Sequence, residues 1–176
     1  MPGLITFVSG PPAAGKSTVA RLLAAKAKFA LVIPVDDMRL WVLSGLSDSV
    51  PWTEESEQQF LMAEVAACAV ARLYADRGFD VFVDHCRNTR RLDELIADQL
   101  GNYTVRRVLL LPDIEANLAR NASRTDKNFN PLVLAETIEH TNRLYRESQA
   151  ERWIIVYNTN LTPQETVARI LASATH

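Results

Sequence analysis

The residues with the clearest chemistry lie near the start of the chain, in the stretch GPPAAGKS. Gly10 is followed, after four residues, by Gly15-Lys16-Ser17. This spacing is typical of a loop whose backbone N–H groups surround phosphates, with Lys16 reaching the β- and γ-phosphate oxygens and Ser17 placed to ligate Mg²⁺. We therefore expect the loop to bind ATP, with Lys16 also catalytic. The expected nucleotide-binding residues here are Gly10, Pro11, Pro12, Ala13, Ala14, Gly15, Lys16, Ser17 and Thr18.

Acidic residues stand where two further apolar runs end. Asp84 closes VFVD, and Asp36 and Asp37 close IPVDD. In a parallel sheet the carboxyl ends of the strands border the crevice that binds ligands. We expect Asp84 to ligate Mg²⁺ or its water shell and Asp36 to accept the proton of an attacking hydroxyl. The alternatives are a solvated turn residue for Asp84 and a helix cap for Asp36.

Basic residues follow these acids. Arg39 lies one helical turn beyond Asp36 and is expected to bind an anionic group of an acceptor, although a surface arginine is the alternative. Arg87 comes three residues after Asp84, just before Arg90 and Arg91. These three could meet an anion on the acceptor side, where we place Arg87. They could equally pair with the acidic side chains of Asp93 and Glu94.

Arg120 and Arg124 lie one helical turn apart in LARNASRTDKNFNP. Their guanidinium groups would leave the same helix face, with Lys127 beyond them. We expect a small helical lid at about residues 118–131 that brings positive charge onto a transferring phosphate. The alternative is a solvated helix end, where basic residues are common.

Short β-branched runs alternate with segments of helical periodicity, which predicts an α/β protein with a parallel sheet wrapped by helices. The expected strands are residues 4–8, 31–35, 81–84, 105–111 and 153–157. Helices are expected around residues 19–23, 60–73 and 132–144, and from near Thr89. Thr162-Pro163-Gln164-Glu165 predicts the start of the last helix, with Val167, Ile170 and Leu171 facing the core. We expect one domain over residues 1–176.

Composition narrows the class of protein. The chain has 176 residues, 48% of them hydrophobic, and a formal net charge of −2. This charge argues against strong sequence-independent binding of nucleic acid. Cys68 and Cys86 match no metal-ligand spacing, so both are expected as free thiols, with Cys68 in the core. Without a recognisable leader or membrane-spanning run, we expect a cytoplasmic protein without a membrane partner, as a monomer or homodimer.

The motifs GPPAAGKST, VDDMR, VFVDH and LARNASR occur in the order seen in polynucleotide 5′-kinases. More broadly, the chain resembles P-loop phosphotransferases that include chloramphenicol phosphotransferase and the zeta-toxin kinases. This resemblance implies the three-layer sandwich of P-loop NTPases, similar to nucleoside monophosphate kinases. It also implies a five-stranded parallel sheet in the order 2-3-1-4-5.

The resemblance also implies roles for individual residues. Asp36 would be the general base, Arg39 would contact the acceptor's phosphate, and Arg120 and Arg124 would be lid arginines toward ATP. The segment VYNTN resembles the one that borders the adenine, which implies that Asn158 and Thr159 bind the base. One motif departs from the polynucleotide kinases, which usually continue the third strand as Asp-Thr-Asn where this chain has DHC at residues 84–86.

The acceptor therefore stays open between a small molecule and a nucleotide or polynucleotide 5′ end. Trp41 and Trp52 could stack on an acceptor ring, although ordinary surface or core positions are slightly favoured. The alternative function, from a different class of protein, is that of a nucleotide-dependent ATPase or switch that acts on a protein partner. It would usually need an arginine supplied by another chain, whereas the candidate arginines here lie in the same chain. A toxin-like kinase with a protein antidote also remains open.

Overall fold

Five strands form an all-parallel sheet in the structure, a computed structural model that describes residues 1–123, 134–148 and 150–173. The strands are β1 (Ile5–Ser9), β2 (Ala30–Pro34), β3 (Asp80–Asp84), β4 (Val105–Leu110) and β5 (Ile154–Val156). Each strand end lies within one residue of its predicted position. The strand order, β2-β3-β1-β4-β5, is the predicted one. β1 therefore lies at the centre of the sheet.

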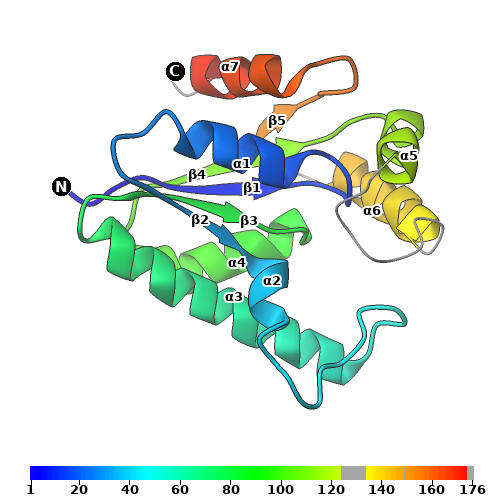
Figure 1. The fold of residues 1–176 in the computed structure, drawn as a ribbon, viewed down its shortest axis with the longest axis horizontal. Coiled ribbons are helices and arrows are strands. Elements are labelled where there is room, and N and C mark those ends of the chain that lie inside the picture. The colour runs from blue at the N-terminus through cyan, green and yellow to red at the C-terminus, as the bar shows by residue number, and fades with distance from the viewer. Residues whose placement is uncertain (124–133, 149, 174–176) are drawn as a thin grey trace.

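Helices cover both faces of this sheet (Figure 1). On one face lie α1 (Lys16–Ala24) and α7 (Pro163–Ser173), and on the other lie α3 (Glu54–Ala75) and α4 (Thr89–Leu100). Each face has its own hydrophobic core. Three further helices, α2 (Val35–Arg39), α5 (Ile114–Ala122) and α6 (Ala135–Glu147), lie toward the carboxyl ends of the strands. They surround the edge at which the sequence predicts the site.

The long helix α3 buries a face made of small residues. Ala67, Cys68 and Ala71 are almost fully buried, whereas Leu73 is 53% exposed. Small side chains let the helix approach the sheet closely, so the large apolar residues that mark this helix in the sequence are not all in the core. At α7, Val167 and Ile170 are buried as predicted, but Leu171 is 40% exposed, so that part of the predicted stripe is wrong.

Several local predictions hold at the helix ends. At α7 the Thr162 hydroxyl accepts a hydrogen bond from Glu165 N, and the Glu165 carboxylate accepts one from Thr162 N, which closes the predicted capping box. The fourth helix begins at Thr89 as predicted. Val35, predicted as the last residue of a strand, instead begins the short helix α2, because the chain turns after Pro34.

Two further observations concern the chain as a whole. None of the helices that the structure describes is long and apolar enough to cross a membrane. Both cysteines are free thiols, with Cys68 buried in the core as predicted.

Candidate active site

The loop Gly10–Ser17 connects the end of β1 to the start of α1. Gly10 has φ +146°, and a Cβ at this position would lie 2.4 Å from the carbonyl oxygen of Leu110 in β4. Gly15 adopts a left-handed conformation with φ +94° immediately before α1. Lys16 is buried, and its Nζ donates a hydrogen bond of 3.0 Å to Pro11 O. The loop thus places a helix N-terminus and a buried ammonium group together, which favours an anion.

Two asparagine side chains hold this loop from outside. Asn117 in α5 donates through Nδ2 to Pro12 O at 2.6 Å, and Asn158 after β5 donates to Ala14 O at 3.0 Å. Both side chains are buried. Asn158 was a predicted site residue, whereas Asn117 was not. No motif in the sequence marks Asn117, because its contact to the loop spans 105 residues.

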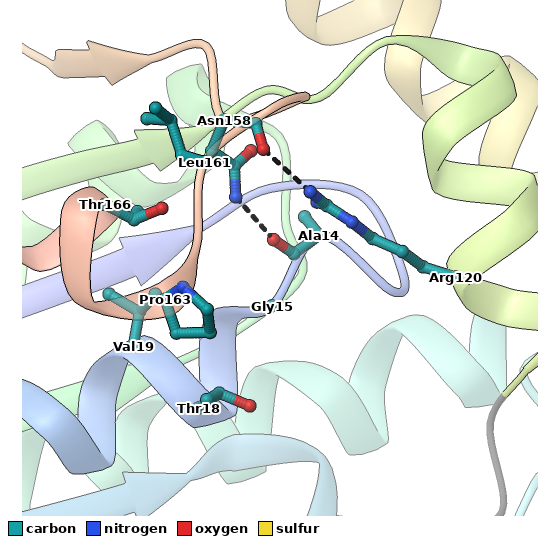
Figure 2. Close-up of a pocket in the computed structure, with 9 residues that line it drawn as sticks. All are labelled: Ala14, Gly15, Thr18, Val19, Arg120, Asn158, Leu161, Pro163 and Thr166. Atoms are coloured by element: carbon teal, nitrogen blue, oxygen red, sulfur yellow. Dashed lines mark hydrogen bonds between the residues drawn. The ribbon is translucent and has the colours of Figure 1, made fainter.

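A small cavity of about 200 Å³ opens beside this loop (Figure 2). Its walls come from the loop, α1, α5, the segment after β5 and the first turn of α7. They are Ala14, Gly15, Thr18, Val19, Arg120, Asn158, Leu161, Pro163 and Thr166. The side chain of Asn158 is buried in this wall, and its Oδ1 has no hydrogen-bond partner among the residues that the structure describes. The cavity therefore offers a mostly apolar slot with a buried amide oxygen.

Arg120 closes one side of this cavity (Figure 2). Its Nη2 donates to Asn158 O at 2.7 Å and to Thr159 O at 3.0 Å, which ties α5 to the segment after β5. Burial lowers the pKa of Arg120 from its ordinary value. The Thr159 hydroxyl accepts a hydrogen bond from Asp113 N at 2.9 Å, and Thr159 is not among the residues that line the cavity. Arg124 lies outside the described residues, as does most of the predicted lid.

A larger cavity of about 1440 Å³ lies at the carboxyl edge of the sheet. It brings together most of the residues that the sequence singles out. Those that line it are Pro12, Ala13, Gly15, Lys16, Ser17, Thr18, Asp36, Arg39, Asp84, Arg87 and Arg120. Ligand pockets usually measure about 300–1,000 Å³, so this cavity is large enough for two ligands to meet.

The strand register explains why Asp36 and Asp84 share this cavity. Asp84 pairs with Val8 of β1 on one side and with Pro34 of β2 on the other, so it lies beside both the phosphate loop and the start of α2. Asp84 is 7% exposed, whereas the Asp36 side chain is 53% exposed. Asp36 does not cap α2, because Pro34 holds that position. An exposed carboxylate at the cavity wall is accessible to a hydroxyl group.

Ser17 and Asp84 offer the oxygen ligands that Mg²⁺ prefers. Both line the large cavity beside Lys16. Within the described parts of the chain, no three His, Cys, Asp or Glu side chains gather as a metal site. Mg²⁺ usually takes one or two protein ligands and fills its other positions with water and substrate phosphates.

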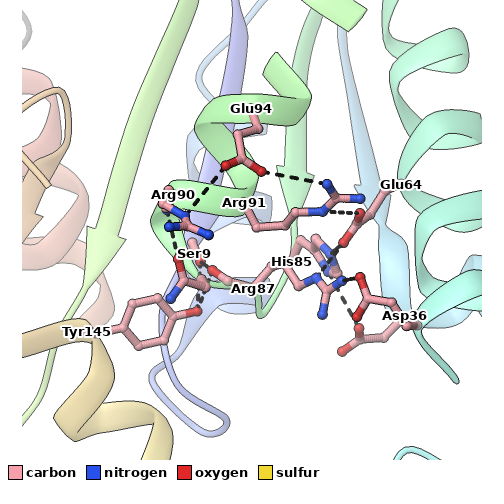
Figure 3. A network of polar contacts seen from close by, with 11 residues as sticks. Ser9, Asp36, Glu64, His85, Arg87, Arg90, Arg91, Glu94 and Tyr145 are labelled. Carbon is pink, nitrogen blue, oxygen red and sulfur yellow. Dashed lines mark hydrogen bonds and ion pairs between the residues drawn. The ribbon is translucent and has the colours of Figure 1, made fainter. Parts of the chain in front are cut away.

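A buried network lies behind Asp36 (Figure 3). His85 is 1% exposed, and its Nε2 lies 2.9 Å from Oε1 of Glu64, while its Nδ1 lies 3.7 Å from Oδ1 of Asp36. Burial disfavours the charged imidazole, but the carboxylates of Asp36 and Glu64 outweigh burial and raise the pKa of His85. Burial also disfavours the Glu64 carboxylate, but His85 and two nearby arginines outweigh it and lower the pKa of Glu64.

Sequence reasoning missed Glu64, although a signal was available. Glu64 stands one helical turn after Phe60 on a predicted apolar helix face, where a charged side chain must find a partner if it is buried. The partner could not be read from the sequence, because His85 lies 21 residues further along the chain. The contact depends on how α3 packs against β3.

Arg87 belongs to the same network (Figure 3). Its Nε donates to Glu64 at 2.8 Å, and its Nη2 donates to Glu57. Arg90 and Arg91 both pair with Glu94, one of the two partners that the sequence suggests for them. Asp93, the other suggested partner, pairs instead with Arg107 at 2.8 Å.

Aromatic side chains form the wall of the cavity beyond Asp36. The ring of Trp52 stacks on that of Phe60 with centroids 4.9 Å apart. Arg39 lies over the Phe60 ring, 4.6 Å from its centroid, and its Nη1 donates to Ser47 O at 2.5 Å. Trp41 is 70% exposed and does not line the cavity.

Several solved kinase structures resemble this chain over nearly its whole length. A sugar kinase from Janibacter sp. HTCC2649 has a TM-score of 0.73 at 17% identity, with 99% of this chain and 95% of that chain covered. A gluconokinase from Sinorhizobium meliloti 1021 has a TM-score of 0.69 at 22% identity, with coverage of 99% and 92%. Thymidylate kinase from Candida albicans has a TM-score of 0.69 at 12% identity, with the same coverage. These likenesses confirm the predicted P-loop NTPase fold.

The sequence itself supports a broader assignment. No curated protein matches it. The AAA domain family matches residues 5–147, a span that begins with β1 and ends with α6. It therefore includes the phosphate loop, Asp36, Asp84 and Arg120. Because this match covers most of the 176 residues, the chain belongs to the AAA domain family.

Proposed function

We propose that the protein is an ATP-dependent phosphotransferase that moves the γ-phosphate of Mg-ATP to a hydroxyl group of an acceptor. The observation that carries this proposal is the large cavity, which joins the phosphate loop to an exposed carboxylate at Asp36. A nucleotide phosphate at one end and an acceptor hydroxyl at the other would meet inside it. The kinase names of the similar structures agree with this chemistry.

The nucleotide end would hold ATP through the residues predicted for it. Lys16 and the loop N–H groups bind the β- and γ-phosphates, and the small cavity beside Asn158 takes the base. Ser17 and Asp84 would hold Mg²⁺, which when bound neutralises part of the phosphate charge. Arg120, and Arg124 by prediction, place positive charge near the transferring group. Thr159 remains a predicted contact to the base.

The acceptor end of the cavity would supply the general base. Asp36 accepts the proton of the acceptor hydroxyl as its oxygen attacks the γ-phosphorus and the bond to the β-phosphate oxygen breaks. Arg39 and Arg87 line the same cavity. In this proposal the chain is one kinase domain over residues 1–176, with its lid at about 118–131, and it acts in the cytoplasm.

The deciding experiment follows labelled γ-phosphate from Mg-ATP into a pool of sugars, nucleosides and 5′-hydroxyl oligonucleotides. Asp36→Asn should leave ATP affinity largely intact and cut transfer by about 10²–10⁴-fold, the range for loss of a general base. Asp37→Asn, a change of the adjacent exposed carboxylate, is the matched control and should affect transfer far less.

The competing reading has a distinct outcome in the same experiment. If label leaves only as free phosphate, and no acceptor accelerates ATP consumption, the protein is an ATPase or switch and the kinase proposal fails. An equal loss of ATP binding in Asp36→Asn would instead give that residue a role in holding the nucleotide or its metal.

A further inference from the structure

The acceptor end of the large cavity has a flat aromatic wall. Trp52 and Phe60 stack with an interplanar angle of 22°, and both line the cavity that contains Asp36. Phe60 is buried, but Trp52 remains 47% exposed. An indole that is backed by a second ring, and still accessible, offers its free surface to a flat group of a ligand.

The basic side chains on this wall are already engaged within the protein. Arg87 is held by Glu57 and Glu64, and its guanidinium lies over Trp52 at 5.0 Å from the ring centroid. Its guanidinium is thus held by acidic side chains of the protein itself. Arg39 lies against the Phe60 ring and donates to the Ser47 carbonyl. Both arginines pack against the aromatic pair, and Arg87 is in addition held by two carboxylates.

Carboxylates also line this cavity. Asp36, Asp37 and Glu136 lie on its wall, from α2 and α6. The other cations of this cavity, Lys16, Arg21 and Arg120, come from α1 and α5 beside the phosphate loop, where the nucleotide is proposed to bind. An acceptor that carries a phosphate or carboxylate would therefore meet these three negative charges and, on α2, the positive charge of Arg39. Like charges at close range disfavour binding, and removing them from water adds to the cost.

We propose that the acceptor is an uncharged alcohol with a flat ring, which stacks on Trp52 while its hydroxyl group reaches Asp36. This rests on the proposed phosphotransferase function and names the substrate class of that site. A phosphorylated sugar, a nucleotide or a polynucleotide end is thereby disfavoured as the acceptor.

The test measures binding by calorimetry in the presence of Mg²⁺ and a non-hydrolysable ATP analogue, so that its result does not depend on turnover. Two matched pairs of probes separate charge from shape. Thymidine and thymidine 3′-monophosphate share a ring and a free 5′-hydroxyl but differ in charge. Phenyl β-glucoside and glucose share the sugar hydroxyls but differ in the flat ring. We expect thymidine and phenyl β-glucoside each to bind about tenfold or more tightly than its partner, the scale of one stacking contact or one charge repulsion.

Protein variants locate the contact. Trp52→Ala should weaken binding of phenyl β-glucoside by about tenfold, the usual loss for an aromatic stacking partner. Trp41→Ala is the matched control: Trp41 lies in the same segment but outside the cavity, and its loss should leave binding unchanged. Tighter or equal binding of the 3′-monophosphate overturns the inference, as do equal binding of glucose, equal effects of the two variants, or no response to either uncharged ring compound.

The two proposals can fail separately. Binding of the uncharged ring compounds without any transfer of label would contradict the kinase and leave the binding site supported. Transfer of label chiefly to thymidine 3′-monophosphate or to a 5′-hydroxyl oligonucleotide would support the kinase and overturn the inference about its acceptor.

Discussion

The imidazole of His85 lies between two carboxylates, those of Glu64 and Asp36. Its imidazole is almost completely buried, and so is the Glu64 carboxylate that it contacts. In a surface ion pair water shares the charge, but here the protein must supply every partner. Removal of one member therefore leaves a charge buried without compensation. The cost of such a loss is larger than that of any exposed pair.

Glu64→Leu should lower the free energy of unfolding by about 3–5 kcal/mol, the range for breaking a buried ion pair from one side. Glu94→Leu is a useful control, because Glu94 also pairs with Arg91 but its side chain is 53% exposed. It should cost about 1 kcal/mol or less. Urea unfolding followed by circular dichroism gives both values. Equal effects of the two changes would show that the buried network adds no stability.

The same pair predicts a pH dependence of stability. Glu64 has a lowered pKa in the folded state, so its contribution is present above the unfolded value of 4.5 and is lost as the pH falls through the folded value. His85 has a raised pKa, so its contribution is present below the unfolded value of 6.5 and is lost as the pH rises through the folded value. Their joint contribution should be greatest between pH 4.5 and 6.5.

The difference in unfolding free energy between wild type and Glu64→Leu, measured across this range of pH, reports that contribution. This difference in unfolding free energy should become smaller below pH 4.5 and also at alkaline pH. A difference that stays constant from acid to alkaline pH would contradict the assignment of charge to these two side chains.

The phosphate loop is an element in which the close approach of two backbones decides which residues fit. Gly10 lies so near the carbonyl of Leu110 that a side chain has no space, whereas Gly45 also has a positive φ, +79°, but a Cβ there would meet no atom within 4 Å. Gly10 and Gly45 therefore separate two effects that a glycine can have. One is tolerance of a positive φ, and the other is the absence of a Cβ.

Gly45→Ala should cost about 1–3 kcal/mol from backbone strain alone. Gly10→Ala should cost more, because the loop must also move away from β4, and it should abolish ATP binding. Thermal unfolding and nucleotide titration measure the two effects. If Gly10→Ala binds ATP normally, the contact between this loop and β4 does not shape the site.

Much of the architecture was predictable at this scale because it depends on local patterns. The β-branched runs placed every strand, and Thr162 with Glu165 placed the start of α7. The predictions were less complete where the outcome depends on which segments meet in space. Leu171 turned outward, and α2 begins at Val35 rather than after the Asp36 cap that the sequence offered as an alternative. The contacts of Glu64 and Asn117 join segments that no periodicity connects. The predicted roles of Arg39, Arg87 and Arg124 remain predictions.

For the whole molecule, nucleotide binding should appear as added stability. A ligand that binds only the folded state at 100 times its dissociation constant stabilises a protein by about 2.7 kcal/mol. Mg-ATP at such a concentration should therefore raise the melting temperature by several degrees. Lys16→Ala should remove this shift while leaving the melting temperature of the free protein near that of wild type. A shift that survives the substitution would locate the nucleotide away from the phosphate loop.

The position of β1 at the centre of the sheet has a consequence for biosynthesis. Ile5 pairs with Val81 on one side and with Val105 on the other, so β1 leaves the ribosome long before either neighbour exists. At about 5–20 residues per second, the wait lasts on the order of several seconds. During this time a largely apolar strand and the loop that follows it have no partner. The nascent chain is therefore most exposed to aggregation before β4 emerges, and a chaperone that binds short apolar segments would act on β1 first.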